Sequence, residues 1–208
     1  MQAAEQSRTL LALGLGLTAA PANALGGLFI ARRDWSRQYL KYFLALGAGF
    51  MLAAAFLEMI PEAIRLAGSR ALLLVLGGYF IVHFFEHTLA PHFHFGEETH
   101  VVEMAPQHAG YTALLGLMIH TFFDGVAIAS GFLVSAWLGG VIFLAVFLHK
   151  LPEGFTVASL MLASGQSRRI AFLASVMLGA ATLAGVLLMN LLRGEVSYAL
   201  PISAGVTL

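Results

Sequence analysis

The chain has 208 residues, of which 59% are hydrophobic and only 11% are charged, and its mean hydropathy is +0.85. A soluble domain carries roughly twice this share of charged residues, so the composition indicates a membrane protein. The net charge of zero argues against a nucleic-acid-binding surface, and the absence of cysteine excludes disulfides and thiolate metal sites. Any metal site must therefore use nitrogen and oxygen ligands.

A helix that spans a membrane needs about 20 mostly apolar residues. The sequence predicts an all-α polytopic bundle with six complete spans, at residues 9–31, 39–64, 71–89, 111–134, 138–163 and 170–192. A seventh apolar stretch begins at Val196 and stops at Leu208, too short to cross unaided, so we expect a longer complete protein. The alternative is a six-span protein with a hydrophobic tail. Residues 1–208 are predicted to form a single transmembrane domain.

The first stretch has a second interpretation. Leu10 to Ala20, followed by Ala22-Asn23-Ala24, is similar to a secretory signal peptide with a small-residue cleavage site. Arg8 is the only positive charge before it, and the apolar run continues to Arg32-Arg33, which favours a retained helix.

The distribution of Lys and Arg predicts the orientation, because cytoplasmic loops are enriched in both. With the N-terminus outside, six of these residues lie on the inner side, namely Arg32, Arg33, Arg37, Lys41, Arg168 and Arg169. Four lie on the outer side, namely Arg8, Arg65, Arg70 and Arg193. The difference favours an outside N-terminus and a cytoplasmic loop at 91–108. Short loops are typical of a bacterial protein, which would lie in the inner membrane.

Two segments within apolar spans carry the chemistry: His-Thr-Phe-Phe-Asp-Gly at 120–125 and His-Lys-Leu-Pro-Glu-Gly at 149–154. Each places an imidazole and a carboxylate four residues apart, on one face of a helix. A carboxylate at the bilayer centre costs about 2.5–3.5 kcal/mol on insertion scales, so a bound cation explains two of them better than hydrogen bonds alone. We therefore predict a divalent-metal site formed by His120, Asp124, His149 and Glu153. The alternative is two buried histidine–carboxylate hydrogen bonds that join the helices.

Imidazole nitrogen and carboxylate oxygen suit zinc, the expected substrate, and also iron(II), manganese, cobalt or cadmium. Pro152 lacks a backbone donor and is expected to distort the helix just before Glu153. Gly125 and Gly154 allow neighbouring helices to approach closely.

The two segments repeat at an offset of 29, since His120 aligns with His149, Asp124 with Glu153, and Gly125 with Gly154. Consecutive spans run in opposite directions, so the repeat is inverted, as in many transporters that bind substrate at the membrane midplane.

Lys150 is an unusual residue in this setting. In a structural role, its side chain reaches the membrane interface or pairs with Asp124 or Glu153. In a functional role, its ammonium supplies a fixed positive charge beside the metal and limits the binding of further cations. The two roles are compatible.

At these residues the chain resembles the ZIP family of divalent-metal transporters. Leu-Glu-Met-Ile-Pro-Glu-Ala at 57–63 is similar to the end of the family's second helix, and a His-bearing polar loop follows the third span. The resemblance implies eight helices in a three-plus-two-plus-three arrangement with both termini outside. It also implies metal movement toward the cytoplasm through a site between spans four and five.

Three features depart from the family pattern. Many members bind two metals, with Asn at the position of Thr121 and an acidic residue at that of Lys150. The sixth span has no acidic residue at its centre, where Thr182 is the polar group, and helices seven and eight are missing or incomplete. We infer a single-metal site in which Lys150 takes the place of the second cation.

Further polar residues are secondary candidates. Glu58 and Glu62 lie four apart on the second span and suit a transfer step at the outer mouth or interfacial capping. A His- and Glu-containing tract near the inner end of the third span and in the loop can catch a departing metal or sense its level, although a solvated loop is the alternative. It comprises His83, Glu86, His87, His92, His94, Glu97, Glu98, His100, Glu103 and His108.

The sequence thus favours a membrane transporter, not an enzyme, with the metal ion and the lipid bilayer as partners and a homodimer as an open alternative. A membrane metallo-hydrolase, similar to alkaline ceramidases and adiponectin receptors, would need an open metal position and a general acid–base. A non-transporting metal sensor is the third alternative.

Overall fold

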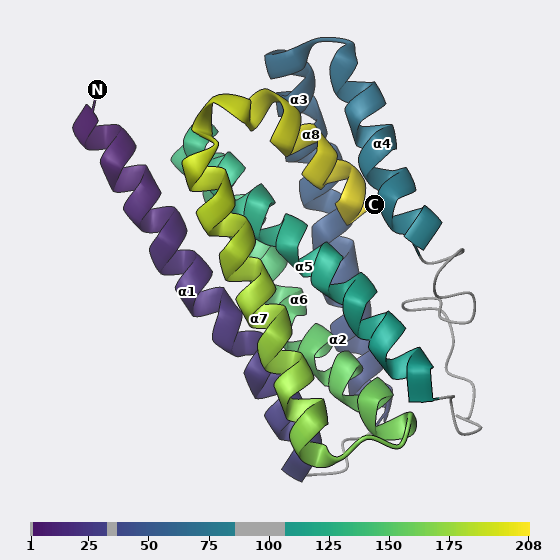
Figure 1. The fold of residues 1–208 in the computed structure, drawn as a ribbon. Coiled ribbons are helices and arrows are strands. Elements are labelled where there is room, and N and C mark those ends of the chain that lie inside the picture. The colour runs from purple at the N-terminus through teal and green to yellow at the C-terminus, as the bar shows by residue number, and fades with distance from the viewer. Residues whose placement is uncertain (1, 33–36, 86–106) are drawn as a thin grey trace.

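The computed structural model describes residues 2–32, 37–85 and 107–208, and the regular structure within them is helical (Figure 1). This confirms the predicted all-α class for these ranges. The longer helices are α1 (Gln2–Arg32), α2 (Arg37–Ala54), α4 (Arg70–Phe84), α5 (Gln107–Val134), α6 (Ala136–Ala163) and α7 (Arg168–Leu191). The shorter elements are the π-helical turn η1 (Ala55–Met59), α3 (Ile60–Ala67), the 3₁₀ turn η3 (Arg193–Glu195) and α8 (Val196–Thr207).

Four of the described helices are long and apolar enough to cross a membrane, at Ser7–Leu28, Gly110–Val134, Ala136–Ala163 and Arg168–Leu191. They correspond to the first, fourth, fifth and sixth predicted spans. The second predicted span is divided between α2, η1 and α3, and the described part of the third is the shorter apolar helix α4. The total of six complete spans therefore stays a prediction.

The seventh apolar stretch folds as α8, which packs against α4. A Cβ atom on Gly205 of α8 would lie 1.9 Å from the carbonyl oxygen of Val75, and one on Gly78 of α4 would lie 2.2 Å from that of Ile202. The two backbones can approach this closely only because both positions lack a side chain.

Helices α1, α5, α6 and α7 pack against one another, and α2 packs against α6 (Figure 1). In the crossing of α5 with α7, a Cβ on Gly125 would lie 2.0 Å from the carbonyl oxygen of Thr182. A Cβ on Gly185 would lie 2.0 Å from the carbonyl oxygen of Phe122. Glycine thus brings these backbones into direct contact, as predicted for Gly125.

The crossing of α1 with α6 is built in the same way. A Cβ on Gly154 would lie 2.0 Å from the carbonyl oxygen of Asn23, and one on Gly26 would lie 2.2 Å from that of Leu151. Gly154 and Leu151 lie 29 positions after the corresponding Gly125 and Phe122 of α5. The offset found between the two sequence motifs therefore recurs in how their helices pack.

The connections are divided between two ends of the bundle (Figure 1). The start of α1, the turn between α3 and α4, and the turn between α7 and α8 lie at one end. The last turn of α1 and the connection from α6 to α7 lie at the other. This division agrees with the predicted distribution of Lys and Arg between two sides, and which end faces the cytoplasm stays a prediction.

Candidate metal centre

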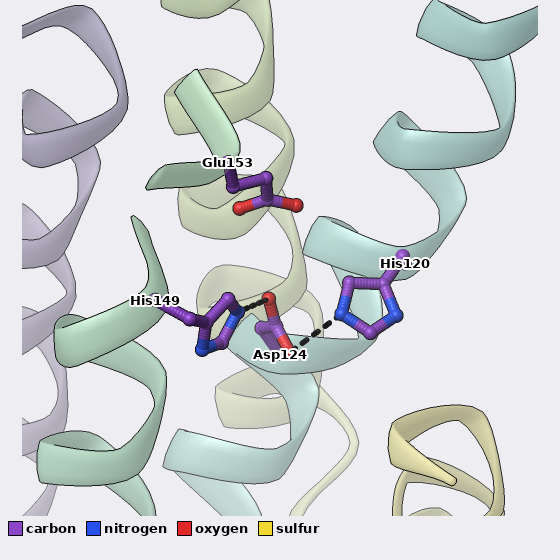
Figure 2. Close-up of side chains that lie close together, drawn as sticks. All are labelled: His120, Asp124, His149 and Glu153. Carbon is purple, nitrogen blue, oxygen red and sulfur yellow. Dashed lines mark hydrogen bonds and ion pairs between the residues drawn. The ribbon is translucent and has the colours of Figure 1, made fainter. Parts of the chain in front are cut away.

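The structure brings together the four residues predicted to bind metal (Figure 2). His120 and Asp124 come from α5, and His149 and Glu153 come from α6. One candidate ligand atom of each residue lies within 4.8 Å of those of the other three. The two carboxylates are buried and the two imidazoles are partly buried. Among the residues that the structure describes, no other group of three or more His, Cys, Asp or Glu side chains is arranged in this way.

The ring of His149 is oriented by its own helix. Its Nδ1 lies 3.1 Å from the carbonyl oxygen of Ala145, which can only accept, so Nδ1 carries the hydrogen. In a neutral ring whose hydrogen is on Nδ1, Nε2 has the lone pair that a metal ion needs. Nε2 lies 3.2 Å from Oδ2 of Asp124, and Nε2 of His120 lies 3.8 Å from Oδ1 of the same carboxylate. The contact between His149 and Asp124 is a hydrogen bond when Nε2 carries a hydrogen, and without that hydrogen the two acceptor atoms need a cation between them.

Lys150 is fully buried and pairs with both carboxylates. Its Nζ lies 2.6 Å from Oδ2 of Asp124 and 3.0 Å from Oε2 of Glu153. The ammonium therefore contacts one oxygen of each carboxylate, while the other two oxygens are free of it. With neutral imidazoles the group has a formal charge of −1, because one ammonium opposes two carboxylates. A divalent ion would change this to +1, which disfavours a second cation.

The two threonines noted as departures are buried and bonded within their own helices. The Thr121 hydroxyl donates to the carbonyl oxygen of Met118 at 3.1 Å, and the Thr182 hydroxyl donates to that of Leu178 at 3.3 Å. Neither hydroxyl hydrogen is therefore used at the centre of the site.

Asn23 of α1 was not predicted as a member of this site, since in the sequence it lies in a segment similar to a signal-peptide cleavage site. It is fully buried, and its Nδ2 donates to the carbonyl oxygen of Lys150 at 3.1 Å and to Oε2 of Glu153 at 3.0 Å. A single carboxamide within an apolar stretch was the available signal, because such a group needs a polar partner inside the bundle.

The secondary candidates do not join the four-residue group. Glu58 is half-buried in the π-helical turn, and Glu62 accepts hydrogen bonds from the guanidinium of Arg65. His83 stacks on the ring of Tyr79, with 5.4 Å between the ring centroids. The remaining candidates lie outside the residues for which the structure gives side-chain positions, namely Glu86, His87, His92, His94, Glu97, Glu98, His100, Glu103 and His108.

Comparison with known proteins identifies relatives in three organisms. The chain is 29% identical over 136 residues to an uncharacterized protein of Methanocaldococcus jannaschii, which covers 64% of this chain and 55% of that protein. It is 32% identical over 110 residues to the zinc transporter ZIP13 homolog of Drosophila melanogaster, and this alignment covers 50% of this chain and 31% of that protein. It is 24% identical over 209 aligned residues to the zinc transporter zipt-7.1 of Caenorhabditis briggsae, and this alignment covers 74% of this chain and 53% of that protein. The matched regions thus span between about a third and just over half of these relatives.

A sequence model of the ZIP zinc transporter family matches residues 9–111 and 96–206, which together cover nearly the whole chain. With the apolar helices, this match indicates a multi-pass membrane protein. It agrees with the prediction of a transporter and not an enzyme. The resemblance inferred from the two motifs is confirmed: the chain belongs to the ZIP zinc transporter family.

Proposed function

We propose that this chain carries a divalent metal ion across a membrane through a site formed by His120, Asp124, His149 and Glu153. The observation that supports this most strongly is the convergence of two imidazoles and two carboxylates from α5 and α6. Four nitrogen and oxygen atoms within 4.8 Å of one another can surround one ion after small movements of the side chains. The site lies within two apolar helices, where an ion needs such ligands to replace its water.

Zinc is the proposed substrate. A set of two nitrogen and two oxygen ligands suits tetrahedral zinc, and two of the relatives are named zinc transporters. Iron(II), manganese, cobalt and cadmium are the alternative substrates, because their ligand preferences overlap with those of zinc.

One ion is proposed to bind at a time. The ammonium of Lys150 contacts Asp124 and Glu153 on one side and supplies a positive charge at the place where other family members are expected to hold a second metal. This fixed charge also offsets part of the attraction between the carboxylates and the transported ion. The ion is therefore bound less tightly than by two unopposed carboxylates, which favours its release.

The proposed direction is toward the cytoplasm, with the N-terminus outside and six complete spans followed by the apolar helix α8. The excess of Lys and Arg at the end of the bundle that holds the last turn of α1 and the connection from α6 to α7 supports this orientation. In a bacterial cell the membrane would be the inner membrane.

The decisive experiment is zinc uptake into proteoliposomes that contain the 208-residue chain. We expect His149→Ala combined with Glu153→Ala to abolish uptake, because two of the four ligands are lost. Ser159→Ala is the matched control, since this α6 hydroxyl donates only to the carbonyl oxygen of Phe155. Equal uptake by the double variant and the unmodified chain would exclude this site as the pathway.

A further inference from the structure

Asn23 connects a third helix, α1, to the proposed ion site. Its Nδ2 donates to Oε2 of Glu153 at 3.0 Å and to the backbone carbonyl oxygen of Lys150 at 3.1 Å. Both partners can only accept, so the amide nitrogen and not the amide oxygen must face them. The orientation of the carboxamide is therefore fixed by chemistry.

Glu153 is held through one of its two oxygens. Oε2 accepts from Nδ2 of Asn23 and from Nζ of Lys150, both at 3.0 Å. Oε1 is buried and has no hydrogen-bond partner among the described residues, and the same is true of Oδ1 of Asn23. A buried acceptor without a partner is unfavourable, so these two oxygens are suited to a cation or a water molecule that accompanies it.

The position of Asn23 is set by the backbone as well as by its side chain. Its carbonyl oxygen lies 2.0 Å from the place that a Cβ on Gly154 would take, so α1 and α6 are in direct contact one residue beyond Glu153. In the matching crossing of α5 with α7, the corresponding residue is Thr182, whose hydroxyl donates within its own helix. Of these two crossings, only that of α1 with α6 therefore supplies a side-chain donor to a carboxylate of the site, that of Glu153.

We propose that Asn23 is a positioning residue of the ion site: it holds Oε2 of Glu153, directs Oε1 toward the transported ion, and thereby sets the affinity for that ion. This proposal rests on the proposed function, in which Glu153 is one of four ligands. Groups that orient a metal ligand typically change metal affinity about 10–100-fold when they are removed.

The test compares Asn23→Ala and Asn23→Leu with the unmodified chain. Alanine removes the donor and leaves space, whereas leucine removes the donor and retains most of the volume. We expect both variants to raise the zinc concentration at half-maximal uptake about 10-fold or more, with a smaller change in the maximal rate. A loss of folded protein alone would instead lower the maximal rate at an unchanged half-maximal concentration.

Ser175→Ala is the matched control. Ser175 is a fully buried polar residue of α7 that faces α1 at Gly27, and its hydroxyl donates to the carbonyl oxygen of Phe172. We expect this variant to keep the half-maximal concentration of the unmodified chain. Zinc affinity measured by calorimetry on the detergent-solubilised full chain provides a readout that does not require transport.

The outcomes separate the two proposals. An unmodified chain that neither takes up nor binds zinc would overturn the proposed function. Zinc binding by the unmodified chain, with the same affinity in both Asn23 variants, would overturn the positioning role alone. A weaker affinity in both Asn23 variants but not in Ser175→Ala would support it.

Discussion

Lys150 and the two carboxylates that it contacts form a buried charged group in which each member depends on the others. Its Nζ lies 2.6 Å from Asp124 and 3.0 Å from Glu153, and all three side chains are almost inaccessible to solvent. A buried ion pair contributes little net stability compared with apolar residues, but the loss of one partner leaves an uncompensated buried charge.

Lys150→Met is therefore expected to lower the free energy of unfolding by about 3–5 kcal/mol in the absence of metal. Zinc should restore part of this loss, because a bound divalent ion would neutralise the carboxylates that the ammonium no longer contacts. Thermal unfolding of the detergent-solubilised chain, with chelator and with zinc, measures both effects. Arg169→Gln is the control, since Arg169 is exposed at the start of α7. A melting temperature in chelator that is unchanged by Lys150→Met would contradict the prediction.

The single-ion hypothesis is also tested at the level of residues. Combining Lys150→Asp with Thr121→Asn replaces the fixed cation with a carboxylate and adds a carboxamide next to His120. We expect the number of zinc ions bound per chain to rise from one toward two, because the second position would then carry ligands and not a positive charge. Elemental analysis of the purified protein measures the stoichiometry, and an unchanged value would refute the hypothesis.

At the scale of helices, glycine determines how closely the elements that carry the site approach their neighbours. Gly125 follows Asp124 directly and lies against the carbonyl oxygen of Thr182, while Gly154 follows Glu153 directly and lies against that of Asn23. Each carboxylate of the candidate site is thus adjacent to a tight helix crossing. The crossings involve α7 and α1, which places a supporting helix behind each of the two helices that carry the candidate ligands.

Gly125→Ala is expected to destabilise the chain by about 1–3 kcal/mol, because the new methyl group would lie 2.0 Å from a backbone oxygen and α5 would have to move away from α7. Unfolding in denaturant measures the loss. Gly140→Ala on α6 provides the comparison, since a Cβ there meets no atom within 4 Å. Similar losses in the two variants would mean that the tight crossing does not limit stability.

For the whole molecule, the proposed topology places the turn between α3 and α4 outside and the start of α7 inside. The 208 residues include no cysteine, so a single introduced thiol reports its own location. We expect Ser69→Cys, but not Arg169→Cys, to react with a membrane-impermeant maleimide added to intact cells. Both residues are exposed, and permeabilised cells should label both. The reverse pattern would invert the orientation, and labelling of both in intact cells would contradict the assignment of the ends.

Much of the site was predictable because it depends on local geometry. A His and a carboxylate four residues apart must share a face of any helix, and the length of the apolar stretches identified the helices that carry them. The offset of 29 residues was also predictable, because the two motifs can be aligned directly in the sequence. Pairing of Lys150 with Asp124 or Glu153 was one of the predicted alternatives. Its contact with both carboxylates arises because α5 and α6 meet at this point.

The sequence by itself determined the all-helical class, the family and the four candidate ligands, because the relevant residues are close in the chain or lie in long apolar runs. The tertiary structure decided which helix supports each candidate ligand. Asn23 and Glu153 are 130 positions apart, and Gly125 meets α7 and not α6. Contacts of this kind depend on how the helices pack against one another, and no periodicity within a single helix encodes that packing.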